Sequence, residues 1–448
     1  MLVMALILLE RRAMNGTIFL ADTQAEIFEK KEKVLYFIFL LFFFALYMPG
    51  IDWLYNAGMW LIFVYSFFFN SLNEKWKLLK KREAILFIIL FFLLNCTSAL
   101  LSNNIKEGIS WAGIRISIFI FPLALGTIYI SQLLKERILL GYVVATCIAA
   151  SCCLLHGIIR AVARHDWSLM YNDNLSDIIN LQSIYFAGLI NIALLSFGYL
   201  QWKKSFLVNK FWWWPLLLIL LPAHFLLASR IAIIILYATV FFYVLYTIIQ
   251  QKKIIRGLAI ATGLFCAGFL FFLIFPKTLN RFKEIGYTRF DYSSMAKESH
   301  FNVALTPDQW NGANLRIAVW ECAWTVTQQH FFQGTGLGDK MDVLKKQYAK
   351  KGFVFGIKTN RNVHNTYLDV WMSLGIIGLL IFLTGFFILP IAACIKTNDW
   401  YGLLVITFLG VSLFTETYLD RTVGNTILSF FLSFIACYKM PATTPGIY

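Results

Sequence analysis

Charged side chains are scarce in this sequence: Asp, Glu, Lys and Arg make up 14% of its 448 residues, while 59% are hydrophobic. A soluble domain carries about 25% charged residues, so this deficit argues against a soluble globular protein. Ten-residue segments of alternating polarity, which are typical of a transmembrane β-barrel, are also lacking. A backbone in lipid must satisfy its own hydrogen bonds, so the composition indicates helices that lie in a membrane.

Metal-binding patterns are missing as well. Seven of the eight cysteines lie in apolar stretches, and Cys322 alone lies in a polar one, so that stretch cannot close a disulfide of its own. There is no CxxC pair and no His/Cys cluster. We therefore expect no metal site and no cofactor. Histidines without ligand-like spacing are interpreted as structural, and these are His156, His165, His224, His300 and His330.

Long apolar runs are what the sequence has in abundance. They recur from Val34 to Met440, and each is about 15–22 residues long, near the length that crosses ~30 Å of hydrocarbon. They predict an all-α polytopic membrane protein of about twelve transmembrane helices. The expected spans are residues 34–48, 53–72, 84–101, 109–130, 138–159, 181–200, 211–228, 231–250, 257–276, 370–394, 400–418 and 423–438.

The distribution of Lys and Arg predicts the orientation of these spans. Basic connections occur at residues 30–33, 75–82, 135–137, 203–210 and 252–256, on alternate sides of the spans. Under the positive-inside rule those sides are cytoplasmic, and so are both termini. The chain then divides into a cytoplasmic segment, nine spans, a large outer loop between helices nine and ten, three spans and a cytoplasmic tail, with boundaries at 1–33, 34–276, 277–364, 365–438 and 439–448.

The net charge of +15 requires no nucleic acid, because part of it anchors the cytoplasmic side and part lies in the outer loop. Basic residues in that loop would suit an anionic ligand. The loop is partly helical. Asn314 to Gln329 has an apolar stripe and Asn314 as a possible cap, and Lys340 to Lys351 follows as a basic helix. The stripe consists of Leu315, Val319, Cys322 and Val326.

Two arginines are candidates for binding an anion. Arg230 follows Ser229 between two apolar spans at the outer face, where an ionisable group is costly and a functional candidate by default. Arg316 shares its loop helix with only one other charge, Glu321. A guanidinium offers a planar fork of donors that suits phosphate oxygens. The alternatives are an interfacial anchor for Arg230 and a solvated surface arginine for Arg316.

His364 stands where the outer loop re-enters the membrane. Asn365 or Thr366 can cap the following span, which places the ring beside the positive end of that helix dipole. This field disfavours the imidazolium form and favours the neutral ring that a general base requires. The alternative is a capping or interfacial histidine.

Other charged residues are less distinctive. Arg115 lies inside the fourth expected span and should face the bundle or a polar cavity, where it would also meet an anionic substrate. Glu416 and Asp420 with Arg421 are candidates for an interfacial ion pair. Three glycines between 334 and 338 look superficially like a nucleotide loop, but no βαβ unit surrounds them, so a flexible turn is the preferred interpretation.

Several short motifs follow one another along the second half of the chain. They are Ser229-Arg230 before a span, Leu315-Arg316-(x)3-Trp320, Gly334-x-Gly336-x-Gly338, His364-Asn365-(x)2-Leu368, and Leu374-Gly375-Ile376-Ile377-Gly378-Leu379. In this order, and on this side of the membrane, they resemble the bacterial O-antigen ligase and polymerase superfamily. The resemblance extends from about the sixth expected span to the tenth.

This resemblance implies a GT-C-like, metal- and ATP-independent membrane glycosyltransferase of the bacterial inner membrane, active on its periplasmic face. The donor would be an undecaprenyl-pyrophosphate-linked glycan and the acceptor lipid A–core, in lipopolysaccharide biosynthesis. Arg230 and Arg316, and less clearly Arg115, would bind the pyrophosphate, and His364 would activate the acceptor hydroxyl in an inverting displacement. Membrane lipids are the other expected partners. Supporting roles fall to Ser229, Asn365 and Tyr367.

Other functions remain open at this point. An O-antigen polymerase or a protein O-oligosaccharyltransferase would use the same donor with a different acceptor, namely a second lipid-linked glycan or a serine or threonine. A transporter or flippase is the remaining class. It should carry ionisable residues near the membrane midplane and inverted repeats, whereas here the candidates gather at the outer face and no repeat is found.

Overall fold

The computed structural model describes residues 29–205, 207–274, 276–299 and 309–437. Helices make up this part of the chain, and the only strand-like pairing within it is an isolated bridge between Ser299 and Asn311. The all-α prediction is therefore confirmed for the described residues. The predicted terminal segments 1–33 and 439–448 lie largely or wholly outside them.

Every expected span coincides with a helix. Residues 29–45 are helical. The apolar helices that follow are α2 (Asp52–Ser66), α4 (Glu83–Leu101), α5 (Ile105–Ile114), α6 (Ser117–Gly126), α7 (Gln132–Arg164), α9 (Ser183–Trp202), α10 (Trp213–Leu226), α11 (Arg230–Ile249), α12 (Ile254–Ile274), α17 (Thr366–Leu383), α18 (Leu389–Lys396), α19 (Trp400–Ser412) and α20 (Thr422–Cys437).

Within the described residues, five helical stretches are long and apolar enough to cross a bilayer alone, and the α5–α6 pair would make a sixth. Four further apolar helices are shorter. The molecule thus has the character of a membrane protein, and the number of twelve spans stays a prediction. The helix α7 extends well beyond its expected 138–159: its 33 residues reach about 50 Å, so its polar ends can project past the hydrocarbon.

Two of the expected spans are broken rather than continuous. In place of the span expected at 109–130, the chain forms α5, turns at Arg115 and Ile116, and continues as α6. The two helices are inclined to each other by 40°. Helix α17 is kinked at Gly375, whose φ of 71° lies in the left-handed region. A π-helical turn, Thr384–Ile388, then joins α17 to α18. Mean hydropathy misses such breaks because Arg115 and Gly375 are each flanked on both sides by apolar residues of the same run.

The turn that contains Gly334, Gly336 and Gly338 packs into the kink of α17. Thr335 and Gly336 donate their backbone N–H groups to the carbonyls of Met372 and Ser373, at 2.8 and 3.0 Å. A Cβ on Gly375 would lie 2.0 Å from the carbonyl oxygen of Phe332, so only glycine allows this approach. The backbone groups left free by the kink are thus satisfied by the loop, and this turn is packed in place rather than a free flexible turn.

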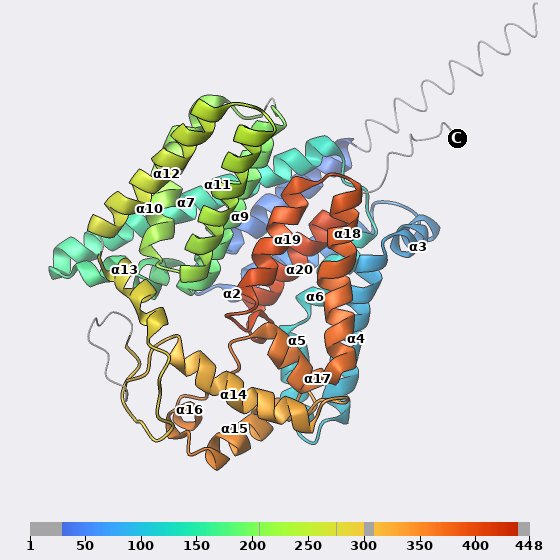
Figure 1. Cartoon of the computed structure of the whole chain (residues 1–448). Coiled ribbons are helices and arrows are strands. Elements are labelled where there is room, and N and C mark those ends of the chain that lie inside the picture. The colour runs from blue at the N-terminus through green and yellow to red at the C-terminus, as the bar shows by residue number, and fades with distance from the viewer. Residues whose placement is uncertain (1–28, 206, 275, 300–308, 438–448) are drawn as a thin grey trace, which may run out of the picture.

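The described residues of the long polar segment 277–364, predicted to be the outer loop, pack around a second hydrophobic core. Figure 1 shows α14 (Asn314–Gln329), α15 (Lys340–Lys350) and α16 (Val354–Lys358) together at one end of the molecule, beyond α17 and α5. The predicted stripe of α14 is buried: Leu315, Val319, Cys322 and Val326 are at most 2% exposed. They pack with Trp310, Tyr348 and Phe353, among others. The remaining short helices are α3 (Leu72–Lys81), α8 (Asp173–Ser176) and α13 (Pro276–Lys283).

The start of α14 differs from the prediction in one detail. Asn314 is its first residue and does not cap it; the side-chain oxygen of Asn311 accepts instead from the N–H groups of Ala313 and Asn314, at 2.7 and 3.1 Å. Asn314 turns its amide to the carbonyls of Arg289 and Gln309. The cap therefore comes from three residues upstream, because the amide of Asn314 holds the preceding loop segment.

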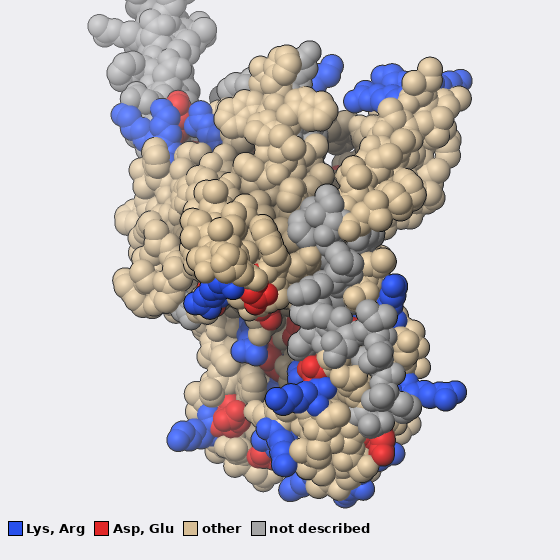
Figure 2. Space-filling view, turned by 90° about the vertical axis from the view of Figure 1, so that its left-hand side faces the viewer, with Lys and Arg blue, Asp and Glu red and all other residues tan. Residues whose placement is uncertain are grey.

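Charge is distributed along the molecule as a membrane protein requires. Figure 2 shows Lys and Arg gathered at the two ends of the visible face, with a broad band of uncharged residues between them. The face is hollowed where this band meets the loop end, and acidic and basic side chains lie inside the hollow.

Candidate functional site

A cavity of about 1110 Å³ lies where the loop helices meet the membrane helices. Its walls come from α5, α11, α14 and α15, from residues 171–174 and 182–184, and from the segments 359–364 and 415–421. Arg230, Ser229, Arg316 and His364 all line it. The structure thus brings together residues that are up to 135 positions apart in the sequence, from His364 back to Ser229.

The two arginines meet across Gly312. Arg230 is the first residue of α11, and Arg316 lies one turn into α14. A Cβ on Gly312 would lie 2.7 Å from Nη2 of Arg230 and 3.2 Å from Nη1 of Arg316. Both guanidinium groups therefore occupy the space that a side chain at Gly312 would fill. Two like charges in this arrangement repel each other, and an anion bound between them would stabilise both.

Arg316 is held in a fixed position. Its Nε donates to the carbonyl of Thr415 at 3.0 Å, and its Nη1 donates to the carbonyl of Gly312 at 2.5 Å. Burial lowers the pKa of Arg316, and the nearby Glu416 carboxylate opposes that effect. An arginine remains charged under such a shift, so the site keeps a desolvated positive charge aimed at the cavity.

His364 is constrained in its backbone and in its side chain. Its φ of 48° is left-handed, an uncommon conformation for this residue and one that often marks a functional position. It directly precedes Asn365, which caps α17 as predicted by accepting from the N–H of Leu368 at 3.1 Å. His364 Nδ1 lies 3.3 Å from Oε2 of Glu416. A carboxylate at Nδ1 favours the tautomer that carries its hydrogen there and leaves Nε2 as the acceptor.

Glu416, expected from the sequence only as part of an interfacial ion pair with Asp420 and Arg421, lines the cavity beside His364. It lies in the turn after α19, and this turn is fastened to the start of α17: Thr366 donates its hydroxyl to the carbonyl of Glu416 at 2.7 Å and accepts from the N–H of Tyr418 at 3.1 Å. No local pattern shows that these two segments meet. An acidic residue at the end of an apolar span was the available signal.

The predicted supporting residues have different positions. Ser229 precedes α11, is 9% exposed and lines the cavity. Asn365 and Tyr367 do not line it. The hydroxyl of Tyr367 donates to the carbonyl of Gly410 at 2.8 Å and so ties α17 to α19. These two residues shape the frame around His364.

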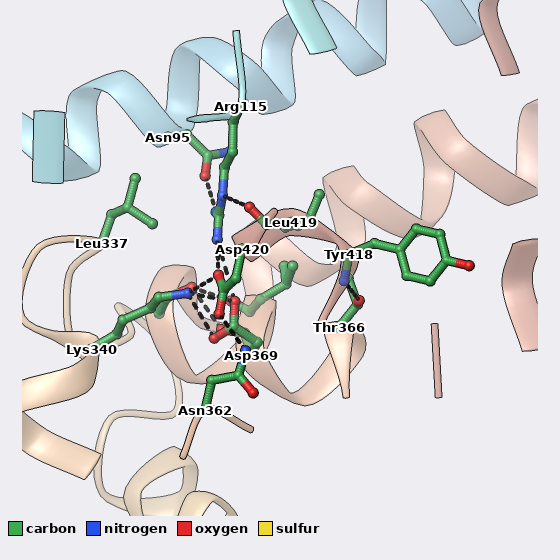
Figure 3. Close-up of polar contacts among 12 residues, drawn as sticks. Asn95, Arg115, Leu337, Lys340, Asn362, Thr366, Asp369, Tyr418, Leu419 and Asp420 are labelled. Atoms are coloured by element: carbon green, nitrogen blue, oxygen red, sulfur yellow. Dashed lines mark hydrogen bonds and ion pairs between the residues drawn. The ribbon is translucent and has the colours of Figure 1, made fainter. Parts of the chain in front are cut away.

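Arg115 lies beside the cavity but not among its lining residues. It occupies the break between α5 and α6 and is fully buried. Its guanidinium donates to Oδ1 of Asn95 at 2.5 Å and to the carbonyl of Leu419 at 3.2 Å. Its Nη2 lies 3.3 Å from Asp369 and 3.4 Å from Asp420. Figure 3 shows these contacts.

Lys340 completes this group, which we call the buried ion cluster: Arg115, Lys340, Asp369 and Asp420. The Lys340 ammonium, from the first residue of α15, lies 2.9 Å from Asp369 and 2.5 Å from Asp420 (Figure 3). It also lies over the ring of Trp111, 4.5 Å from its centre. The two cations and two anions balance, and the cluster ties a loop helix to the membrane helices. Charges of opposite sign inside apolar runs, at 115 and 369, were the sequence signal that could have indicated it.

Comparison with known proteins bears on this arrangement. The family model described as O-Antigen ligase matches residues 215–383, a stretch that includes Arg230, Arg316 and His364. No curated protein matches the chain. The described residues contain no group of three or more His, Cys, Asp or Glu placed to hold a metal ion.

Proposed function

We propose that this chain, whose residues 215–383 match the O-antigen ligase family model, is a membrane glycosyltransferase that transfers a glycan from undecaprenyl pyrophosphate to a hydroxyl of lipid A–core. The observation that carries this proposal is the placement of Arg230, Arg316 and the His364–Glu416 pair around one cavity. That cavity lies between the apolar helices and the polar loop, where a lipid-linked sugar and a second glycan can meet.

The arginine pair serves the leaving group. As the bond between the anomeric carbon and the phosphate oxygen breaks, negative charge grows on the departing pyrophosphate, and Arg230 and Arg316, which lie together beside Gly312, neutralise it. Donors fixed in advance, as Arg316 is by Thr415, need no reorganisation during the reaction. Each such donor typically contributes about 3–4 kcal/mol of transition-state stabilisation.

His364 serves the nucleophile. With Nδ1 facing Glu416, Nε2 accepts the proton of the acceptor hydroxyl as its oxygen attacks the anomeric carbon. Glu416 orients the ring and stabilises the imidazolium that forms. The products are the new glycoside, inverted at the anomeric carbon, and free undecaprenyl pyrophosphate. The pyrophosphate already present in the donor supplies the leaving group, so neither ATP nor a metal enters this scheme.

In this scheme the cavity lies on the periplasmic face of the inner membrane, with both termini in the cytoplasm. The guanidinium of Arg115 faces Asn95, Asp369 and Asp420, and this placement supports a structural role for it in the buried ion cluster. Direct contact of Arg115 with the donor stays a prediction, and the Arg115→Met variant tests it.

Deletion of the gene tests the acceptor. The proposal predicts that lipopolysaccharide loses its distal glycan while polymerised glycan accumulates on undecaprenyl pyrophosphate. Core capped with single units would identify a polymerase instead. Unchanged lipopolysaccharide with loss of glycan from a protein would identify a protein O-oligosaccharyltransferase.

A purified system tests the chemistry. Full-length protein, lipid-linked donor and lipid A–core should suffice for transfer without ATP, and the rate should persist in EDTA. A protein that moves the lipid across vesicle membranes but forms no glycosidic bond would be a transporter, and the proposal would be abandoned.

A further inference from the structure

A second concave surface lies beside the cavity, between α14 and α17. This groove has a volume of about 500 Å³ and is open on one side. It is lined by Ile317, Trp320, Glu321, Trp324, Asn365, Tyr367, Leu368, Trp371 and Leu379.

The polar groups that line the groove are occupied by other parts of the protein. The Trp320 indole donates to the carbonyl of Val363 at 3.0 Å, and the Trp371 indole donates to that of Phe331 at 3.3 Å. Three more side chains have partners of their own, namely Asn365 (Leu368 N–H), Tyr367 (Gly410 carbonyl) and Glu321 (Tyr292 hydroxyl). Apart from the exposed Glu321 carboxylate, the groove therefore presents mainly ring faces and hydrocarbon, which suit an apolar occupant.

The groove and the cavity adjoin each other and share part of their lining. Ile317 and Trp320 line both of them. Arg316, the preceding residue of α14, holds the cavity side of this boundary. A ligand with an anionic group between the arginines would thus meet apolar surface directly beside that group. The far end of the groove reaches Leu379, on the apolar stretch of α17.

We propose that this groove binds the polyprenyl chain of the donor, in particular the isoprene units next to the pyrophosphate. The inference rests on the proposed function. In the donor the pyrophosphate is bonded directly to the hydrocarbon chain, which matches a groove that begins at the arginines. In lipid A–core, sugars separate the acyl chains from the accepting hydroxyl, so those chains fit this position less well.

Trp324 is suited to a test of this proposal because it lines the groove and is 46% exposed. It is uncharged, so replacing it removes no ion pair. Trp167 is a matched control: it is a similarly exposed tryptophan, 59%, in the 3-10 turn Trp167–Met170, and it lines neither the groove nor the cavity. The variants are Trp324→Glu, Trp324→Leu and Trp167→Glu in the full-length purified protein.

Each variant is assayed with two donors that carry the same glycan pyrophosphate, one esterified to undecaprenol and one, the short donor, to a methyl group that has no isoprene unit to enter the groove. Trp324→Glu should raise KM for the long donor about tenfold and leave KM for the short donor unchanged. Trp324→Leu should restore most of the affinity, and Trp167→Glu should behave like the wild type with both donors.

Equal KM values for the long donor in Trp324→Glu and Trp167→Glu would overturn the inference and leave the proposed function intact. Equal increases of KM for both donors would also overturn it. If the wild type transfers neither glycan, the proposed function itself fails and this inference fails with it.

A binding measurement covers the case in which Trp324→Glu does not fold. A photoreactive phenylalanine analogue at position 324 should crosslink to radiolabelled long donor, and excess undecaprenyl pyrophosphate should suppress the product. Suppression by phosphatidylethanolamine to the same extent would mean that the groove merely contacts bulk lipid, and the inference would be wrong.

Discussion

Two groups of charged residues lie side by side in this molecule, the arginine pair of the cavity and the buried ion cluster. In the cluster, Arg115 and Lys340 face Asp369 and Asp420, and all four side chains are at most 3% exposed. In the cavity, Arg230 and Arg316 face each other across Gly312. The cluster is balanced within itself, whereas the arginine pair brings two cations together on a cavity wall that the Glu416 carboxylate also lines.

This difference suggests two roles for arginines in an apolar setting, one in holding the fold together and one in binding a ligand. An arginine in an apolar setting needs a partner, and that partner is either another side chain or a ligand. Arg115 has its partners inside the fold, so its main effect is to hold α5, α15 and α17 together. Arg230 and Arg316 line a cavity that is large enough for a ligand, and in the proposed function an anionic group of the donor binds beside them. If the two groups differ in this way, substitutions in the cavity should affect catalysis and substitutions in the cluster should affect stability.

His364→Ala should have the largest effect on catalysis. Removing the base should lower kcat about 10²–10⁴-fold. The thermal unfolding temperature in detergent should stay within the error of the wild type, because His364 lies at the cavity wall. His330→Ala, an exposed histidine after α14, is the control and should retain full activity. Wild-type kcat in His364→Ala would remove it from the proposed mechanism.

Arg115→Met should act mainly on stability. It leaves Asp369 and Asp420 with Lys340 as the remaining cation of the cluster, and breaking a buried pair typically costs about 3–5 kcal/mol. We expect a marked drop in the unfolding temperature, and Lys340→Met should reproduce it. Arg164→Met, at the exposed end of α7, is the control.

The same variant tests whether Arg115 contacts the donor. An unchanged unfolding temperature combined with a raised KM for the donor would place Arg115 in the binding site. The contrast between the two groups of charges would then be lost.

Arg316→Ala should reduce kcat/KM about 10²–10³-fold, since it removes a fixed donor to the leaving pyrophosphate. Arg316→Lys keeps the charge but loses the fork that bonds to Thr415 and Gly312, so it should recover only part of the rate. Circular dichroism and unfolding temperature check that the fold is intact. Full activity of Arg316→Ala would contradict the proposed role of the arginine pair.

Gly312→Ala should have the smallest effect. Its methyl group would lie against both guanidinium groups and force them apart, and overpacking of this kind typically costs ~1–3 kcal/mol. We expect kcat/KM to fall about tenfold, with the deficit in donor binding. Gly286→Ala is the matched control, because a Cβ there has no neighbour within 4 Å. Equal activity of the two variants would show that the arginines do not act as a pair.

Much of the fold could be predicted from the sequence. Each expected span coincides with a helix, and the apolar stripe of α14 is buried as its periodicity indicates. Both signals are local, because a run of apolar residues or a repeat of three and four positions shows directly which surface avoids water. Arg230, Arg316 and His364 stood out for the same reason: each is a polar residue at the edge of an apolar or amphipathic segment.

The breaks at Arg115 and Gly375 were not predictable in this way. At Gly375 the strained backbone is stabilised by hydrogen bonds from residues 331–336, which belong to another segment. Glu416 and Lys340 were missed for a related reason. Their partners, His364 and the two aspartates, are 29 or more positions away in the sequence.

Local composition and pattern were therefore enough to predict that this protein lies in lipid, that it is helical, and that Arg230, Arg316 and His364 are the polar residues most worth testing. Only the tertiary structure decided which charges are balanced by the fold and which line a cavity. Pairing depends on distances of a few ångströms between segments remote along the chain, and no local pattern encodes them. That is why Arg115 and Arg316, both expected from the sequence to meet an anionic substrate, have different surroundings in three dimensions.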